Sequence, residues 1–232
     1  GDKVIGAILF ENTMDREIDG KPSALTLWED RGVVPFLKVD KGLEDAAHGV
    51  KLMKPMPGLD ALLTRAKQTG VFGTKMRSVI DAADPAGIKA NIAQQFEIGQ
   101  QIAGHDLMPI LEPEVTISIA DKAEAEAMVR DEIAAHLDAL PEGAQIMLKL
   151  TLPSAANFYK PLIEHPKVLK VVALSGGYSR SEANEKLAQN TRMIASFSRA
   201  LTEGLNAKQS DADFDATLAG TIDSIHAASV AG

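Results

Sequence analysis

The stretch Ile146-Met147-Leu148-Lys149-Leu150-Thr151 has the composition of an apolar β-strand with one lysine near its C-terminal end. A charged amine in an apolar strand is costly unless it is paired or neutral. A neutral lysine amine is a nucleophile toward carbonyl groups. A lysine can also bury its stem in a sheet and extend its head into solvent. The strands around Lys149 decide between these interpretations.

Apolar runs alternate with longer amphipathic stretches along the whole chain, which is typical of a βα-repeating protein with a parallel sheet. The expected strands are Val4–Phe10, Val33–Asp40, Val71–Val79, Leu107–Val115, Ala144–Leu150, Val168–Ser175 and Met193–Arg199. The expected helices are Leu59–Thr69, Ile88–Ala103, Asp121–Leu140, Ser181–Gln189 and Asp211–Ser229. The polar segment Asp15–Leu27 contains Asp-Gly-Lys-Pro and is expected to be a surface excursion.

This order of elements predicts an α/β fold, a (β/α)8 TIM barrel with about seven of its eight strands in this chain. We expect residues 1–232 to form a single barrel domain that lacks its first strand and helix. A complete barrel usually has about 250 residues, and the first expected strand begins only three residues into this chain. An open doubly wound sheet is the alternative.

The composition excludes several classes of partner. The formal net charge of −8 argues against nucleic acid or an anionic membrane as the main partner. No apolar run approaches the ~20 residues needed to cross a bilayer, and there is no signal-peptide pattern. A chain with no cysteine fits the reducing cytoplasm. The five histidines are scattered, so we expect no metal site.

Charged residues stand near the ends of four successive strands: Lys38 and Asp40, Lys75 and Arg77, Glu112 and Glu114, and Lys149. The positions 38, 75, 112 and 149 recur at an interval of 37 residues, which suggests equivalent positions in successive βα units. The carboxyl ends of barrel strands meet at one mouth, where active sites lie. Ions gathered there would activate Lys149, whereas the alternative is an ion-pair network that only lines the barrel end.

A second feature is Ser175-Gly176-Gly177, which follows an apolar run and precedes a helix. Small residues let backbone amides approach an anion, and a helix N-terminus favours one. Arg199, at the expected end of the last strand, offers a bidentate donor suited to phosphate. Lys38 and Arg77 form another cationic group. Two separated cationic clusters around a lysine favour a substrate with a phosphate at each end.

Seven stretches carry a family resemblance, in the family's order and over almost the whole chain: Gly6–Thr13, Pro35–Gly42, Gly73–Ser78, Pro109–Glu114, Met147–Leu150, Leu174–Gly177 and Ser196–Arg199. Together they closely resemble the class I fructose-1,6-bisphosphate aldolases in their bacterial form. The resemblance implies reversible cleavage of fructose 1,6-bisphosphate to dihydroxyacetone phosphate and glyceraldehyde 3-phosphate. It also implies a covalent lysine iminium in place of any metal or other cofactor, and a homo-oligomer.

By the same resemblance, Lys149 forms the iminium and Glu112 gives and takes the proton when the carbinolamine loses water. Lys75 and Glu114 match residues that stabilise charged intermediates and orient the nucleophile. The substrate-binding positions fall into two sets. Ser175, Gly176, Gly177 and Arg199 match the ketone-side phosphate site, and Lys38, Ser196 and Arg77, with Asp40 beside Lys38, lie toward the other phosphate.

The family's first strand, which carries a catalytic aspartate, has no match here. Two further interpretations therefore stay open. One is a catalytically weak or inactive barrel that acts as an oligomeric scaffold. The other is a different Schiff-base sugar-phosphate lyase, such as a transaldolase.

Overall fold

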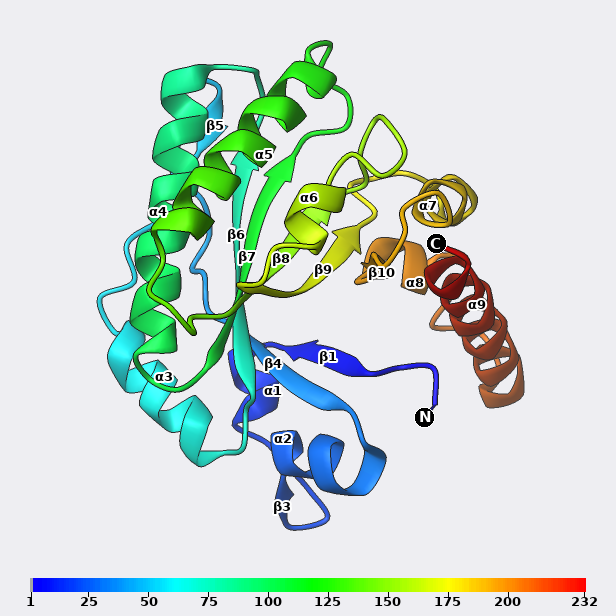
Figure 1. Ribbon diagram of the computed structural model, residues 1–232. Helices are drawn as coiled ribbons and strands as arrows, with labels where there is room; N and C mark the ends of the chain where they lie inside the picture. Colours follow the sequence, from blue (N-terminus) through cyan, green and yellow to red (C-terminus); the bar gives the residue numbers. More distant parts are fainter. Residues whose placement is uncertain (1) are drawn as a thin grey trace.

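A curled sheet of parallel strands dominates the computed structural model, which describes residues 2–232 (Figure 1). Its strands follow one another in the order β1 (Gly6–Leu9), β4 (Val34–Lys38), β6 (Gly73–Ile80), β7 (Met108–Val115), β8 (Ile146–Thr151), β9 (Val168–Leu174) and β10 (Ile194–Ala195). Every neighbouring pair on this path is parallel. The strands lie in chain order, whereas a doubly wound sheet reverses its order at a switch point. The barrel topology with seven strands is therefore confirmed.

The sheet curls without closing. Within residues 2–232 no pairing joins β1 to β10, so both are edge strands. Lys3, just before β1, forms an ion pair of 2.5 Å with Asp223 on helix α9 (Asp211–Ala231), which lies on the far side of this opening. That residues 1–232 are one barrel domain lacking its first strand and helix stays a prediction.

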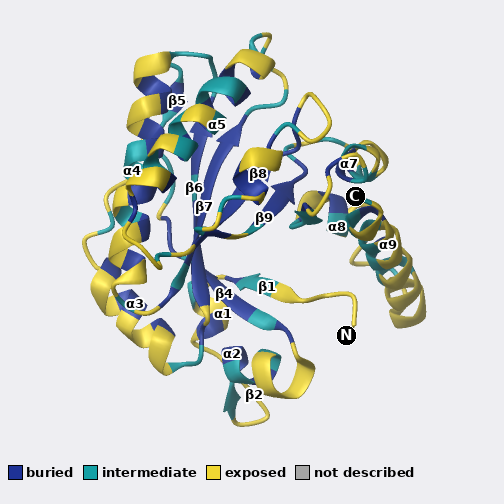
Figure 2. Cartoon of the chain, viewed as in Figure 1, coloured by how far each residue is buried: buried dark blue, intermediate teal, exposed yellow. Residues whose placement is uncertain are grey.

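Helices α3 (Leu59–Gln68), α4 (Pro85–Ala103) and α5 (Lys122–Ala139) lie along one side of the sheet (Figure 1). Asp84 caps α4 by accepting a hydrogen bond of 2.8 Å from the Gly87 amide. The predicted apolar faces are confirmed, since Ile88, Ile92 and Phe96 of α4 are buried, as are Ile133 and Leu137 of α5. Figure 2 shows the outer faces of these helices exposed and the central strands buried.

Each face of the sheet carries its own cluster of buried apolar side chains. Leu37, Met76, Leu111 and Leu148 belong to the large core between the sheet and its helices. On the opposite, inner face a smaller apolar cluster forms from Phe36, Ile110, Met147 and Val172. Side chains two residues apart share a face of a strand. Lys38, Glu112 and Lys149 each stand two residues after a member of this inner cluster, which therefore forms an apolar floor beneath them.

The segment Asp15–Leu27 is more ordered than predicted. It follows α1 (Glu11–Met14) and contains a small hairpin and two short helical turns: β2 (Glu17–Ile18), β3 (Lys21–Pro22), α2 (Ser23–Leu25) and the start of η1 (Thr26–Asp30). Ser23, Ala24 and Thr26 are buried, and the Ser23 hydroxyl donates to the Arg16 carbonyl at 2.7 Å. The description as a polar surface excursion was wrong for this half of the segment, because local hydrogen bonds satisfy its buried polar groups.

Three further elements are short. Strand β5 (Val50–Lys51) pairs antiparallel with the end of β6, and helices α6 (Lys160–Ile163) and α8 (Arg199–Thr202) follow β8 and β10. The last strand is shorter than predicted, because Arg199 begins α8 instead of ending β10. Among residues 2–232, no helix combines the length and apolar character needed to cross a bilayer.

Candidate active site

The strand register brings the charged residues of the inner face together. Lys38 pairs with Lys75 across β4 and β6, and Arg77 pairs with Glu112 across β6 and β7. The pairing of Arg77 with Glu112 spans 35 residues, whereas Lys75 pairs with Ile110. Glu112 therefore stands two residues further along the sheet than Lys75. The regular interval of 37 residues in the sequence therefore does not mark equal levels at this step.

Glu112 lies between two buried lysines. The Lys149 amine is 3.1 Å from Glu112 Oε1, and the Lys75 amine is 2.9 Å from Glu112 Oε2. All three residues are less than 8% exposed. Glu112 Oε2 makes no aligned hydrogen bond within residues 2–232, so charge alone holds this oxygen. A buried carboxylate that bridges two amines is placed to exchange protons with groups on either side.

Asp40 holds the other side of Lys75. Its carboxylate is 3.4 Å from the Lys75 amine and 2.6 Å from the Lys38 amine, and it accepts a hydrogen bond of 3.2 Å from the Arg77 amide. Burial would raise the pKa of Asp40, but Lys75 and Lys38 with this amide outweigh burial, and the pKa lies below the usual aspartate value of 3.8. Asp40 thus stays ionised and keeps Lys75 and Lys38 in place.

We expect the stability that Asp40 contributes to vanish in acid. Because its folded pKa is lowered, the contribution is complete above the unfolded value near 3.8 and is lost as pH falls through the folded value. In urea unfolding at neutral pH, Asp40→Asn should be less stable than the parent, and this difference should shrink toward zero below pH 3.8. Asp45→Asn, at an exposed position with no ion pair within residues 2–232, is the matched control. A difference for Asp40→Asn that stays constant with pH would contradict the assignment.

Glu114 lies two residues beyond Glu112 on β7 and forms a pair with Arg77, which is in register with Glu112. The Arg77 guanidinium donates a short hydrogen bond to Glu114 Oε2. Glu114 is buried, whereas Arg77 is partly exposed. Within the described residues Glu114 has no ion pair with Lys149, so any effect of Glu114 on the nucleophile runs through its neighbours.

The loop after β9 has the backbone that the sequence predicted. Gly176 and Gly177 have φ values of 64° and 115°, in the left-handed region that favours glycine. The Arg199 guanidinium lies beside Gly177, about 3.8 Å from where a Cβ would stand. No hydrogen bond within residues 2–232 uses the amide of Gly176 or Gly177, and Arg199 has no ion pair there. These groups, with the buried Ser175 beside them, are the candidate anion site.

Helix α7 (Arg180–Leu187) follows this loop, and acidic side chains already cap its N-terminus. Its N-cap is Ser179, not Ser181, and Ser179 and Glu182 form a full capping box. The Arg180 amide donates to Glu203 Oε2 at 2.9 Å. Two carboxylates therefore already lie at the N-terminus of α7, and a contribution of its dipole to the predicted phosphate site at Ser175-Gly176-Gly177 stays a prediction.

Ser196 lies nearer to this anion site than to Lys38 along the sheet. Its amide donates to the Ala173 carbonyl of β9 at 2.8 Å, two residues before Ser175. No contact joins Ser196 to Lys38 within the described residues. The grouping of Lys38, Ser196 and Arg77 around one phosphate therefore stays a prediction for Ser196.

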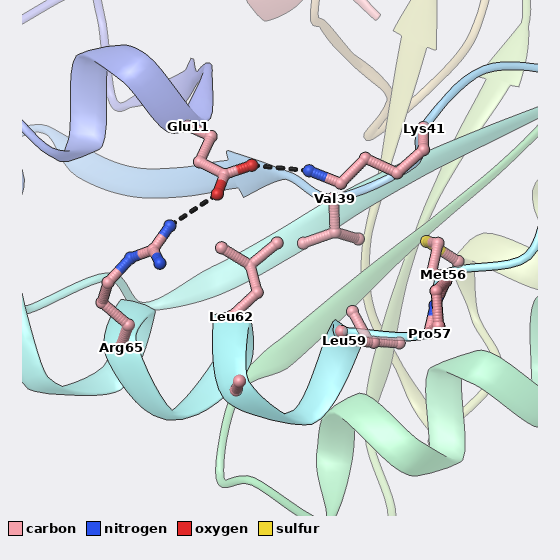
Figure 3. A pocket seen from close by; sticks show the side chains of 10 residues that line it. Glu11, Val39, Lys41, Met56, Pro57, Leu59, Leu62 and Arg65 are labelled. Atoms are coloured by element: carbon pink, nitrogen blue, oxygen red, sulfur yellow. Dashed lines mark hydrogen bonds and ion pairs between the residues drawn. The ribbon is translucent and has the colours of Figure 1, made fainter.

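A cavity of 370 Å³ opens between the ends of β1 and β4 and helix α3 (Figure 3). Glu11 lies between Lys41 and Arg65 at its rim, with ion pairs of 2.5 and 2.6 Å, and apolar side chains including Val39 and Leu62 line the rest. Lys41 and Arg65 hold the pKa of Glu11 below its usual value. Both cations at the rim of this cavity are thus paired with Glu11.

A buried ion pair that the residue pattern did not predict lies beside the loop after β8. Lys122 and Glu126 of α5 form a short ion pair, and the Lys122 amine also donates to the Leu152 carbonyl at 3.0 Å. Glu126 Oε2 accepts from the Ser154 amide at 3.0 Å. The pair anchors the loop that follows Lys149. Its i,i+4 spacing was visible in the sequence, but its burial was not.

Comparisons with known proteins identify the family of this chain. The family model for class I fructose-bisphosphate aldolase, of the glycolytic type, matches residues 1–156. The class 1 fructose-bisphosphate aldolase of Synechocystis sp. is 56% identical over 230 residues, which cover 99% of this chain and 77% of that protein. The enzyme of the same name from Porphyromonas gingivalis is 55% identical over 228 residues, with 98% and 77% covered.

A solved structure extends the comparison to the fold. Fructose-bisphosphate aldolase from Plasmodium falciparum, in a complex with TRAP and a small-molecule inhibitor, superposes with a TM-score of 0.78 at 22% identity. The match covers 99% of this chain and 78% of that one, and at this identity it supports the fold alone. The sequence matches reach further, and they show that the chain belongs to the class I fructose-bisphosphate aldolase family.

Proposed function

We propose that this chain cleaves fructose 1,6-bisphosphate reversibly into dihydroxyacetone phosphate and glyceraldehyde 3-phosphate through an iminium on Lys149. The observation that supports this most directly is the position of Glu112, 3.1 Å from the Lys149 amine and 2.9 Å from the Lys75 amine. A primary amine beside a buried carboxylate is the arrangement that Schiff-base chemistry needs.

In the proposed reaction Glu112 takes a proton from the Lys149 ammonium, and the neutral amine then attacks the ketone carbon and forms a carbinolamine. Glu112 gives a proton to the carbinolamine hydroxyl, which leaves as water, and the iminium remains. The bond between C3 and C4 then breaks, and its electron pair moves onto the iminium nitrogen. The ionised Glu112 takes the proton of the C4 hydroxyl. Lys75, held by Asp40, balances the charge of Glu112 throughout.

We assign the two phosphates to opposite parts of the site. Gly176, Gly177 and Arg199 offer unused donors for the ketone-side phosphate, with Ser175 beside them. Lys38 and Arg77 face the other phosphate. The iminium serves as the electron sink, so the mechanism calls for no metal or other cofactor. The proposal includes a homo-oligomer and a cytoplasmic location, which a chain without cysteine favours.

Borohydride trapping tests the proposal. The chain is incubated with dihydroxyacetone phosphate, reduced with sodium borohydride, digested and analysed by mass spectrometry. A reduced adduct on Lys149 supports lysine chemistry. A folded protein that forms no adduct favours the scaffold interpretation. An adduct with no cleavage of fructose 1,6-bisphosphate favours another Schiff-base lyase or transaldolase.

Arg199→Ala should mainly raise the KM for phosphorylated substrates. Loss of a hydrogen bond to a charged group costs ~1.5–3 kcal/mol, or about 10- to 150-fold in KM, with little change in kcat. Arg192→Ala is the matched control, since Arg192 precedes β10 and Arg199 follows it, at the other end of the strand. Steady-state kinetics measures both, and an unchanged KM would remove Arg199 from the phosphate site.

A further inference from the structure

The backbone ladder between β7 and β8 stops where the reactive side chains begin. It pairs Ile110 with Met147 and Leu111 with Leu148 and goes no further, although the two strands continue to Val115 and Thr151. Strand β7 stays paired with β6 up to Val115, and β8 with β9 up to its last residue. Strands β7 and β8 therefore part at the level of Glu112 and Lys149.

One side chain bridges this gap. The Thr151 hydroxyl donates to the Val115 carbonyl at 2.8 Å, and the Val115 amide donates to the same hydroxyl oxygen at 3.0 Å. Both bonds are buried, and Thr151 is 1% exposed. The hydroxyl thus replaces, in both directions, the backbone bonds that the ladder lacks. Because buried backbone groups are costly to leave unpaired, this bridge holds the strand ends at one separation.

The methyl group of Thr151 contacts the opposite neighbour. Its Cγ2 lies 3.4 Å from where a Cβ on Gly176 would stand, and Ile117 Cγ2 lies 2.7 Å from the same point. No larger side chain would fit at Gly176 without displacing these groups. Thr151 therefore bonds to the end of β7 with its hydroxyl, and its methyl group occupies part of the space in which a side chain at position 176 would stand.

We infer that Thr151 is a positioning residue: its hydroxyl sets the separation of Glu112 from Lys149, and its methyl group seats Gly176 at the anion site. This inference rests on the proposed function. A proton donor that is misplaced by about 1 Å can slow a reaction about 100-fold, so a bridge of this kind acts on the chemical step.

Two variants separate the roles of the two groups on Thr151. Thr151→Val keeps the shape and removes the hydroxyl, and it should lower kcat and the rate of borohydride-trapped iminium formation about 10- to 100-fold, with KM nearly unchanged. Thr151→Ser keeps the hydroxyl and removes the methyl group. It should keep kcat within about twofold and raise the KM for the phosphorylated substrates.

Thr74→Val is the matched control. Thr74 is a fully buried threonine of β6 whose hydroxyl has no hydrogen-bond partner within residues 2–232. Its replacement removes the same atoms from a strand next to the site but breaks no bridge, so kcat and trapping rate should stay unchanged. Equal losses in Thr74→Val and Thr151→Val would overturn the inference, because they would reflect strand packing alone.

Amide hydrogen exchange supplies a readout that does not depend on activity. Protection of the Val115 amide should fall in Thr151→Val and persist in Thr151→Ser. Wild-type protein that forms no adduct would refute the proposed function. Hydrogen exchange of the Val115 amide in the two variants would still show whether the Thr151 hydroxyl bridges the strands. Unaltered protection, or wild-type trapping by Thr151→Val, would overturn the positioning role. If Thr151→Val does not fold, loss of kcat in Thr151→Ser would overturn it as well.

Discussion

Replacing Lys149 by methionine should abolish borohydride trapping of dihydroxyacetone phosphate and lower the rate of fructose 1,6-bisphosphate cleavage on the order of 10⁴-fold or more. Methionine is linear and of similar size, so it keeps the packing above the inner apolar cluster while it removes the amine. Glu112 would keep Lys75 as its partner at 2.9 Å, so no buried carboxylate is left without a counter-ion. The variant should therefore fold.

The matched control is Lys170→Met. Lys170 lies on β9 two residues before Val172 and is half-buried, and burial together with Arg192 lowers the pKa of its amine. Within residues 2–232 it lacks a carboxylate partner such as Lys149 has. If the ion pairs around Lys149 make it the nucleophile, Lys170→Met should form as much borohydride-reduced adduct as the parent chain. An adduct that survives in Lys149→Met, with its mass on Lys170, would show that burial alone selects the amine.

The second large effect is expected from Glu112→Gln. The amide keeps the shape of the side chain but cannot take up or give a proton at the pH of the reaction, and general acid–base catalysis contributes ~10²–10⁴-fold. We expect kcat to fall by about that factor with KM nearly constant, because Glu112 lies beside the amine and not at the anion site. Pre-steady-state trapping should show that formation of the iminium itself is slow.

Glu114→Gln is the matched control for Glu112→Gln. Glu114 pairs with Arg77 and has no ion pair with Lys149 within residues 2–232, so its replacement should slow the reaction less than that of Glu112. Circular dichroism and urea unfolding on both variants exclude a loss of folded protein. A larger loss for Glu114→Gln, or a loss confined to KM for Glu112→Gln, would contradict the assignment of the proton donor.

The amino-acid sequence by itself determined the local elements and the identities of the reactive groups. Alternation with period 2 placed Lys75 with Arg77 and Glu112 with Glu114 on shared strand faces, and the seven strands follow the predicted order. Helical periodicity placed Ile88, Ile92 and Phe96 in the core. These features were predictable because periodicity depends only on which side of an element is buried. Short elements such as β10 were not, because two residues carry too little pattern.

Only the tertiary structure decided which of these groups meet. It set a step of 35 residues between β6 and β7 and placed Glu112 between two amines. It also brought Glu203 to the N-terminus of α7. Thr74 and Thr151 are both buried threonines, yet one hydroxyl is unpaired and the other joins two strands. Register and bridging between strands depend on how segments far apart in the chain pack together, and no local pattern of residues carries that information.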